Sequence, residues 1–327
     1  MLESELARLT KKLSKKIKSI NTKKPIAFLL GPTASGKTDL AIEIHQSVPV
    51  EIISVDSVMV YKDCNIGSAK PTHELLIKHP HHLIDIIEPN LIFTVGDFCI
   101  AAMELVNKIH SKNKMPLFVG GSMMYFKSLL TGLNELPERN DELRKELESI
   151  KEREGVKKLY SMLKKEDPIY ANRIKSNDEQ RIIRALEVIE MSESSFSSLI
   201  SKPKKNIQDD FNIYQYGIFE EDRSLLHSRI EDRLNTIISA GLIDEAHHIL
   251  QKYQIPENHP IRKAVNYKQA IGFINNEYNA DEFFNRALYA TRQLAKRQLT
   301  WLRSWEGLSL FNIDSKNKIK EEIKSLI

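Results

Sequence analysis

Residues 31–38 read Gly31-Pro32-Thr33-Ala34-Ser35-Gly36-Lys37-Thr38, which matches the phosphate-loop pattern G-x-x-x-x-G-K-[ST] at every fixed position. The apolar run 26–30 precedes the loop and predicts a buried parallel strand. Residues 39–44 follow with the spacing of an amphipathic helix. Backbone N–H groups and a helix N-terminus bind phosphate in this context. The stretch therefore predicts a polyphosphate site on an α/β fold, without indicating which molecule carries the polyphosphate.

Two side chains of this loop have the chemistry to act on a polyphosphate. Lys37 can reach the outer phosphate, and the hydroxyl of Thr38 can hold a Mg²⁺ ion. The alternative is a chance glycine turn before a helix, which the flanking strand and helix disfavour.

The composition is that of an intracellular globular enzyme. The chain has 327 residues, of which 41% are hydrophobic and 28% charged, and its length suggests two domains. No apolar run approaches the roughly 20 residues of a membrane helix, and no secretory segment is recognisable. The two cysteines, Cys64 and Cys99, lack metal-type spacing and fit a reducing compartment, so we expect a cytoplasmic protein.

The net charge of +4 is concentrated in the first 24 residues. Residues 1–24 hold eight basic and two acidic side chains, which leaves 40 basic against 42 acidic in the rest of the chain. The overall charge is therefore weak support for a nucleic-acid partner. Leucines and isoleucines three or four apart predict a helical arm in 1–24, and we favour a solvated extension over an RNA- or membrane-binding arm.

Polar side chains follow two further predicted strands. Asp56 comes directly after strand 50–55, and Ser122 follows strand 116–119 and two glycines. Because the carboxyl ends of parallel strands share one edge, we expect a single convergent site there. Asp56 is a candidate general base or Mg²⁺ ligand, and a turn or helix cap is an equally good interpretation from position alone.

The cluster His79-Pro80-His81-His82 resembles a metal site but has no further ligand at zinc spacing. We interpret these histidines as loop and packing residues. A short strand is expected at 83–87, and a helix at 98–109.

The pattern changes at residue 139. Residues 139–200 contain no strand-like run and alternate charges with helical spacing, which predicts an all-helical insertion. A serine- and lysine-rich segment ends it and predicts a hinge. The expected organisation is an extension at 1–24, a P-loop core at 25–138 and 206–327, and a helical insertion at 139–205.

The returning core carries basic residues on two predicted helices. Strand 211–219 is followed by a helix on which Arg229 and Arg233 share a face suited to phosphate oxygens, or to salt bridges with Glu231 or Asp232. The helix 289–305, expected to be the last, has basic residues suited to a phosphate backbone. Its two tryptophans suit either stacking on bases or the core, and we assign them to the core.

These segments together resemble the tRNA dimethylallyltransferases, also called tRNA isopentenyl transferases. The phosphate loop alone occurs in many kinases, but its combination with Ser-Val-Asp-Ser at 54–57 and the Arg-Gln-x-x-Lys-Arg-Gln helix at 292–298 is specific to the family. Further matching segments are 66–71, 81–85, 119–122, 177–178, 180–187 and 229–233, in the family's order.

The resemblance implies a P-loop NTPase-like parallel sheet flanked by helices, with Mg²⁺ as cofactor. It implies transfer of a dimethylallyl group from dimethylallyl diphosphate to the N6 amine of the adenosine 3′-adjacent to the anticodon. Residues Gly31 to Thr38 would bind the diphosphate, Asp56 would be the base, and Lys37 and Arg233 would assist. The positions that match tRNA contacts are Asp56, Ser57, Val58, Met59, Ser122, Arg144, Gln180, Arg181, Ile182, Ile183 and Arg184. We expect tRNA as partner, no membrane, and a monomer.

The chain departs from the family pattern at a few positions. Ser122 replaces a usual Thr and keeps the hydroxyl, Met59 replaces a frequent Gln, and Asn266 replaces a usual Gly, where we expect backbone strain. Glu193-Ser194 replaces a usual Gly-Lys.

Other function classes account for part of the sequence. A small-metabolite P-loop kinase explains the loop and Asp56, but not the helical insertion or the basic C-terminal helix. A prenyltransferase of free adenine nucleotides does not need the insertion. A nucleotide switch or an RNA-binding module without catalysis leaves Asp56 unexplained.

Overall fold

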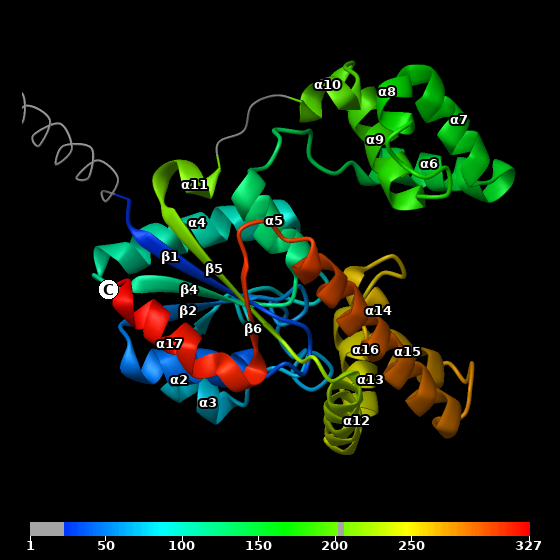
Figure 1. Ribbon diagram of the computed structural model, residues 1–327. Coiled ribbons are helices and arrows are strands. Elements are labelled where there is room, and N and C mark those ends of the chain that lie inside the picture. The colour runs from blue at the N-terminus through cyan, green and yellow to red at the C-terminus, as the bar shows by residue number, and fades with distance from the viewer. Residues whose placement is uncertain (1–22, 202–205) are drawn as a thin grey trace, which may run out of the picture. The chain divides into compact units, whose positions relative to one another are not determined.

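The computed structural model describes residues 23–201 and 206–327 (Figure 1). The predicted N-terminal arm therefore lies almost entirely outside the described residues, as do residues 202–205 of the predicted hinge. Contacts divide the chain into two units. One contains the described residues up to Leu130 together with Ile207–Ile327, and the other is Thr131–Asn206.

The first unit is built on a six-stranded sheet, with every pairing parallel, in the order β3-β2-β4-β1-β5-β6. The strands are β1 (Pro25–Leu30), β2 (Val50–Val55), β3 (His81–His82), β4 (Met115–Gly120), β5 (Asn212–Phe219) and β6 (Ser309–Asn312). Helices join the strands because parallel neighbours need crossover connections. The prediction of a P-loop NTPase-like parallel sheet is confirmed.

Helices cover both faces of this sheet (Figure 1). Alternate side chains of β1 point to opposite faces, so Phe28 packs with α4 (Val95–Ser111) and α5 (Met123–Thr131) in one apolar cluster. Leu29 packs on the other face with α2 (Lys37–Ser47) and α17 (Lys316–Ser325). All six residues of β2 and of β4 are buried, as expected of strands covered on both faces.

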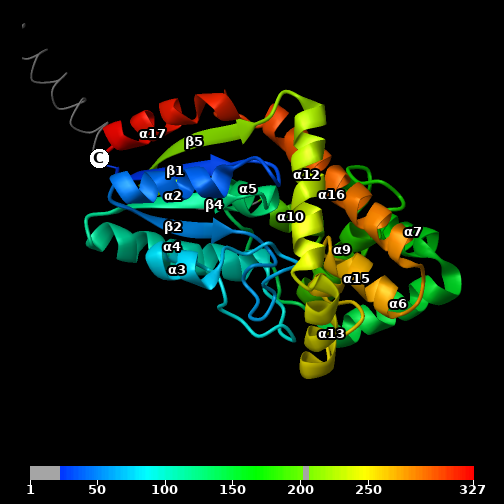
Figure 2. The ribbon, with the colours of Figure 1, turned by 90° about the horizontal axis from the view of Figure 1, so that it is seen from below.

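A group of helices lies beyond the carboxyl ends of the strands. Figure 2 shows β1, β2, β4 and β5 pointing toward α12 (Arg223–Ser239). Helix α12 packs on α16 (Ala280–Arg303) around Ile230 and Ala287. Beside them lie α13 (Leu242–Tyr253), α14 (Pro260–Lys263) and α15 (Tyr267–Ile274).

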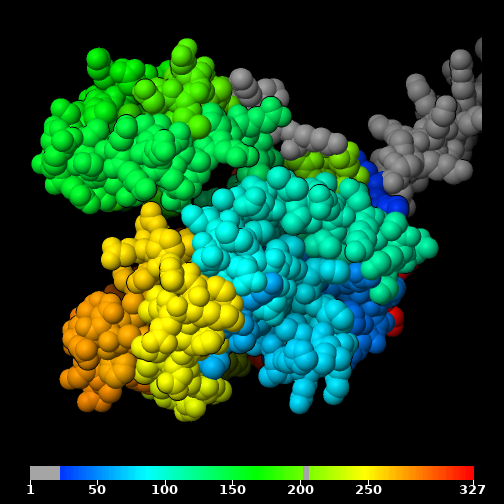
Figure 3. Space-filling view, turned by 180° about the vertical axis from the view of Figure 1, so that it is seen from behind, coloured from blue at the N-terminus to red at the C-terminus, as the bar shows by residue number. Residues whose placement is uncertain are grey.

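These helices bury the loop that follows β2. Tyr61 and Cys64 of that loop share a cluster with Leu242 of α13 and Tyr267 of α15. In Figure 3 the yellow residues of α12 and α13 lie directly against blue and cyan residues of the core. The loop leaving the site edge is therefore held between the sheet and the added helices. The remaining short helices of this unit are α3 (His73–Lys78) and α11 (Ile207–Asp210).

The described residues of the second unit form helices joined by loops and contain no strand. It consists of α6 (Asp141–Glu154), α7 (Val156–Glu166), α8 (Pro168–Ala171), α9 (Glu179–Ser192) and α10 (Phe196–Ile200) around one apolar core. The buried Asp167 carboxylate joins three of them. It accepts the N–H of Tyr170 at 2.9 Å and the N–H and hydroxyl of Ser197 at 2.6 and 2.9 Å. A buried carboxylate with this many donors avoids the cost of an unpaired charge.

Three local predictions are wrong. The strand expected at 83–87 is instead β3 at His81–His82, because Leu83 and Asp85 adopt left-handed backbone with φ of 63° and 56°. Helix 289–305 is not the last, since β6 and α17 follow it. Trp301 is not core: its exposed fraction is 37%, whereas Trp305 is partly buried and donates its indole N–H to Gln215 at 2.8 Å.

The histidine cluster is a packing feature. His82 bonds Glu51 at 2.8 Å, and His45 and His79 approach each other at 3.1 Å through their Nδ1 atoms. Burial acts to raise the pKa of Glu51, but hydrogen bonds from His82, Lys112 and Lys114 outweigh it and hold that pKa at about 2. Among residues 23–201 and 206–327, no three His, Cys, Asp or Glu side chains are placed to hold a metal ion.

Candidate active site

The phosphate loop joins β1 to α2 at the carboxyl edge of the sheet. Gly36 has φ of +77° and Ala34 has φ of +60°, so the loop turns its backbone through left-handed conformations. The N–H of Gly31 donates to the carbonyl of Gly120 at 3.3 Å, and the N–H of Ser122 donates to Val55 at 3.2 Å. The ends of β1, β2 and β4 are thereby tied together, as the polar turns after these strands predict.

Glycine is required where these strand ends meet. A Cβ at Gly120 would lie 2.0 Å from the carbonyl oxygen of Val55, which no side chain tolerates. A Cβ at Gly31 would lie 2.6 Å from the Ser35 hydroxyl and 3.1 Å from the carbonyl of Ile218. Close backbone approach at this edge leaves room for an anion against the loop N–H groups.

Lys37 lies in a cationic environment. Its ammonium donates to the carbonyl of Pro32 at 2.9 Å, which folds the side chain back over the loop. Burial lowers the pKa of Lys37 to about 8; the Arg233 guanidinium acts in the same direction and the Asp56 carboxylate opposes both. Two partly desolvated cations beside one loop favour binding of a multiply charged anion.

Arg233 comes from α12 and approaches the same place. One of its Nη atoms donates to the carbonyl of Ala69 at 3.3 Å. Burial lowers the pKa of Arg233, while the Asp56 and Asp39 carboxylates act to raise it. Lys37, Asp56 and Arg233 thus lie within electrostatic reach of one another.

Arg229 forms a salt bridge, which was one of its two predicted roles, but with a partner other than the two expected. Its guanidinium pairs with the buried Glu220 at 3.1 Å, and neither Glu231 nor Asp232 is its partner. Glu231 pairs instead with Arg292 of α16, at 3.0 Å. Arg229 therefore ties α12 to the segment after β5, and Arg233 is the arginine of the pair that faces the site.

Asp56 uses its two carboxyl oxygens differently. Oδ1 accepts the N–H of Val58 at 2.8 Å and of Met59 at 3.1 Å, which is the turn role expected of an Asp-Ser sequence. Within the described part of the chain, Oδ2 accepts no hydrogen bond. The turn therefore orients the carboxylate while leaving one oxygen for a substrate. Ser57 is exposed, and Met59 Sδ lies 4.0 Å from the Ser54 hydroxyl.

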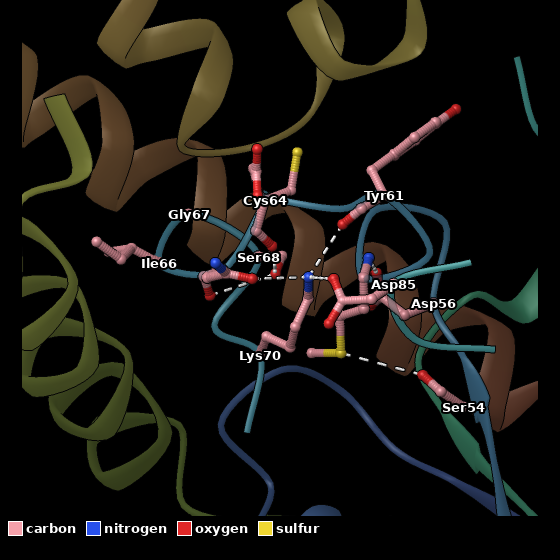
Figure 4. Close-up of polar contacts among 12 residues, drawn as sticks. Ser54, Asp56, Tyr61, Cys64, Ile66, Gly67, Ser68, Lys70 and Asp85 are labelled. Carbon is pink, nitrogen blue, oxygen red and sulfur yellow. Dashed lines mark hydrogen bonds and ion pairs between the residues drawn. The ribbon is translucent and has the colours of Figure 1, made fainter. Parts of the chain in front are cut away.

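The loop after Asp56 is pinned by a lysine that sequence reasoning did not single out. Figure 4 shows the Lys70 ammonium among its acceptors, which are the carbonyl of Tyr61 at 3.0 Å, Asn65 Oδ1 at 2.9 Å and Asp85 Oδ1 at 2.5 Å. The Lys70 side chain is only 2% exposed. Lys70 thus binds two acceptors in the loop and also Asp85, which follows β3, and the adjacent Ala69 is the residue whose carbonyl bonds Arg233.

A second missed residue, Glu245 of α13, anchors the same loop. Its carboxylate accepts the N–H groups of Asn65, Ile66 and Gly67 at 2.7–2.9 Å and the hydroxyl of Tyr267 at 2.6 Å. The neighbouring Asn266 has φ of +74°, so the strain expected at this position is present. No motif signals these partners, because they lie about 180 residues from the loop in sequence.

The insertion holds two of its predicted contact arginines internally. The side chain of Glu187 is fully buried, and Arg144 binds it through two hydrogen bonds of 2.9 Å. Arg184 donates to the same carboxylate at 2.6 Å, and the N–H of Asn140 also donates to it, at 2.8 Å. Burial acts to raise the pKa of Glu187, but these donors outweigh it and lower the pKa.

The other predicted contacts of α9 differ in exposure. Ile182 and Ile183 belong to the helical core. Gln180 and Arg181 are exposed, and Arg181 pairs with Asp178. Only the exposed positions offer side chains to a partner.

Comparison with known proteins agrees with this geometry. A sequence model of the family described as "IPP transferase" matches residues 59–305. The tRNA dimethylallyltransferase of Legionella pneumophila (strain Paris) is 42% identical over 93% of this chain and 99% of its own length. The chain belongs to the tRNA dimethylallyltransferase family.

Other members and solved structures fit this family assignment. The tRNA dimethylallyltransferase of Nitrosomonas europaea is 41% identical over 93% of the chain and 95% of its own length. The full-length tRNA isopentenylpyrophosphate transferase of Bacillus halodurans superimposes with a TM-score of 0.67 at 31% identity, over 93% of this chain and 97% of that one. A eukaryotic dimethylallyltransferase acting on tRNA shares the fold, with a TM-score of 0.77 at 22% identity, over 92% and 78% of the two chains.

The lowered pKa of Lys37 predicts a pH-dependent affinity for a diphosphate. Because the protonated ammonium binds the anion, affinity should be constant below pH 8 and weaken by up to about tenfold per unit above it. Arginine stays protonated throughout this range, so the Lys37→Arg protein should show no such decline, whatever its absolute affinity. Calorimetric titration with dimethylallyl diphosphate from pH 6.5 to 9.5 measures both slopes. Equal slopes in the two proteins would assign the titration to another group.

Proposed function

We propose that this protein transfers a dimethylallyl group from dimethylallyl diphosphate to the N6 amine of the adenosine that follows the anticodon in tRNA, with release of diphosphate. The family membership supports a tRNA substrate and an allylic diphosphate donor. The observation that carries the proposal is that two cations, Lys37 and Arg233, lie within electrostatic reach of one carboxylate, Asp56, beside the phosphate loop.

The donor side of the reaction is a problem of charge. The bond between the allylic carbon and the diphosphate oxygen breaks only if the growing negative charge on the leaving group is stabilised. We propose that the N–H groups of the loop, the Lys37 ammonium and the Arg233 guanidinium supply this stabilisation, which is supported by the position of both side chains beside the loops of the site. Because they are preorganised and partly removed from water, their electrostatic effect is larger than it would be in solution.

The acceptor side needs a base, since the lone pair of an exocyclic adenine amine is delocalised into the ring. As the carbon–nitrogen bond forms, the amine proton passes to Asp56, whose Oδ1 is held by the turn and whose Oδ2 accepts no hydrogen bond from the residues that the structure describes. Such general-base help contributes typically about 10²–10⁴-fold. The adenine must leave its stack to reach this carboxylate, as in other enzymes that act on bases.

A magnesium ion fits the loop chemistry. Mg²⁺ usually keeps several waters and takes few protein ligands besides the phosphates of the substrate. The Thr38 hydroxyl, at the first turn of α2, provides such a single ligand, and we propose that it holds the ion. When bound, the ion would neutralise part of the diphosphate charge.

Exposed basic and aromatic groups support a large acceptor. Lys296, Arg297 and Trp301 are exposed on α16, and Gln180 and Arg181 are exposed on α9. Cations suit phosphate oxygens and an exposed indole suits an unstacked base. We propose that the helical insertion and α16 bind the anticodon stem-loop, and that the enzyme acts as a monomer where tRNA is made, in the cytoplasm. Among the described residues, no helix is long and apolar enough to cross a membrane.

One experiment separates this proposal from its rivals. Unmodified tRNA is incubated with the protein, dimethylallyl diphosphate and Mg²⁺, and the nucleosides are analysed by mass spectrometry. A new N6-dimethylallyladenosine, mapped to the position after the anticodon, is the expected result. Prenylation of free AMP but not of tRNA would favour a nucleotide prenyltransferase, and phosphate transfer from ATP to a small acceptor would favour a kinase.

A further inference from the structure

Gln298 of α16 joins two loops of the site through one side chain. Its Oε1 accepts the N–H of Thr33 in the phosphate loop at 2.9 Å. Its Nε2 donates to the carbonyl of Gly121, in the turn after β4, at 3.0 Å. The residue is 8% exposed. Both halves of the carboxamide are therefore used, and each is used on a different loop.

The backbone around Gln298 is shaped to admit it. A Cβ on Gly121 would lie 2.3 Å from Gln298 Nε2 and 3.2 Å from the carbonyl oxygen of Gly31. Any larger residue at position 121 would therefore push the carboxamide away from the turn. The Gly121 backbone, the phosphate loop and α16 meet at a contact that only glycine permits.

The chemistry of the contact selects a neutral amide. The end of the side chain must accept the N–H of Thr33 at 2.9 Å and donate to the carbonyl of Gly121 at 3.0 Å. Of the uncharged side-chain ends, a carboxamide carries both an acceptor and a donor in this arrangement. A glutamate would keep the bond to Thr33 but place a carboxylate oxygen against the Gly121 carbonyl and add negative charge beside a diphosphate site. An aliphatic side chain would leave both backbone groups unpaired.

We propose that Gln298 is a positioning residue that fixes the donor loop relative to the acceptor turn. The inference rests on the proposed function, in which Thr33 belongs to the diphosphate loop and Ser122, next to Gly121, faces the tRNA. Transfer between two bound substrates requires their reacting atoms to be aligned, and a displacement of about 1 Å can cost about 10²-fold in rate. Gln298 holds the two loops at one distance while touching neither reacting atom.

The helix itself does not depend on this contact. Ala287, Leu288 and Ala295 of α16 pack against α12, and Leu302 packs against the sheet. Removing one carboxamide should therefore leave α16 in place and release only the two loops. A positioning role therefore predicts lower activity with an intact helix, whereas a purely structural role predicts loss of the helix packing as well.

The test compares Gln298→Met and Gln298→Glu with wild type and with Gln251→Glu, which makes the same chemical change at an exposed position of α13. Gln298→Met should lower kcat by about 10–100-fold while the KM for tRNA stays within about twofold. Gln298→Glu should also weaken binding of dimethylallyl diphosphate. Gln251→Glu should behave as wild type. Thermal unfolding of Gln298→Met should occur within a few degrees of wild type.

Two further measurements keep the inference testable whatever the activity. Hydrogen exchange of the peptide spanning residues 31–38 should be faster in Gln298→Met, because the Thr33 N–H loses its acceptor. Gly121→Ala should reproduce the kcat defect without any change in α16. Unchanged exchange and a kcat within twofold of wild type would overturn the positioning role. If the wild-type protein forms no dimethylallyladenosine, the proposed function is wrong. The hydrogen-exchange result would still show whether Gln298 holds the Thr33 N–H in the phosphate loop.

Discussion

Asp56→Asn should lower kcat by about 10²–10⁴-fold, with dimethylallyl diphosphate and tRNA still bound at near wild-type affinity. The asparagine side chain keeps an oxygen that can accept the N–H groups of Val58 and Met59, so the turn survives. What is lost is the carboxylate oxygen that takes the amine proton in the proposed mechanism. Single-turnover rates with preformed protein–tRNA complex measure the chemical step directly.

Asp56→Ala is the weaker design for the same question. It removes the base and also leaves two backbone N–H groups of the turn without their acceptor, so loss of activity would mix two effects. A suitable control is Asp63→Asn, in the same loop, where the carboxylate bonds Lys252 and Tyr253 instead of facing the site. A chemical step that stays within threefold of wild type in Asp56→Asn would show that another group accepts the proton.

The sequence predicts the sheet and the loops at its edge because their signals are local. Each signal lies within about ten positions of sequence: a run of apolar residues, a glycine turn, or a polar residue at a strand end. Strands β1, β2 and β4 follow these patterns. Their convergence then follows from parallel pairing alone. The predictions that were wrong lie where this local logic is weak: β6 is a four-residue strand with two exposed residues, and β3 contains two histidines.

The supporting contacts of the site carry no local signal. Gln298 lies 265 positions from Thr33, and Glu245 lies about 180 positions from the loop that it anchors. Gln298 ends the Arg-Gln-x-x-Lys-Arg-Gln segment at 292–298, but neither that segment nor the sequence around Glu245 indicates which loop the side chain contacts. Asp56 shows the same difficulty within one residue, since the turn interpretation is confirmed for Oδ1 and the catalytic interpretation stays a prediction for the other oxygen.

Arg184→Ala should destabilise the helical insertion by about 3–5 kcal/mol. The charge of Glu187 would stay fully buried with one of its two arginine partners removed, and an uncompensated buried charge is costly. Glu187→Gln should cost less, because the partly exposed Arg144 and Arg184 can turn to solvent. Differential scanning calorimetry of the full chain measures both, with Glu190→Gln, an exposed position on the same helix, as the control.

This buried cluster also sets the sign of a pH effect. The folded-state pKa of Glu187 is lowered, so its contribution to stability is present above the pKa of the unfolded chain and is lost as the pH falls through the lowered value. The stability difference between wild type and Glu187→Gln should therefore shrink on acidification.

Because Arg184 is bound to the buried Glu187 and Arg181 is not, only a substitution of Arg181 tests tRNA binding without a change in stability. Arg181 is exposed and its ion pair with Asp178 is a surface pair, so Arg181→Ala should leave unfolding unchanged. If Arg181 contacts a phosphate, its removal should raise the KM for tRNA and reduce the salt dependence of tRNA binding by about one unit of slope, with donor binding unaffected. In Arg184→Ala, by contrast, tRNA binding should fall together with stability. Equal tRNA affinity and salt slope in Arg181→Ala and wild type would remove Arg181 from the interface.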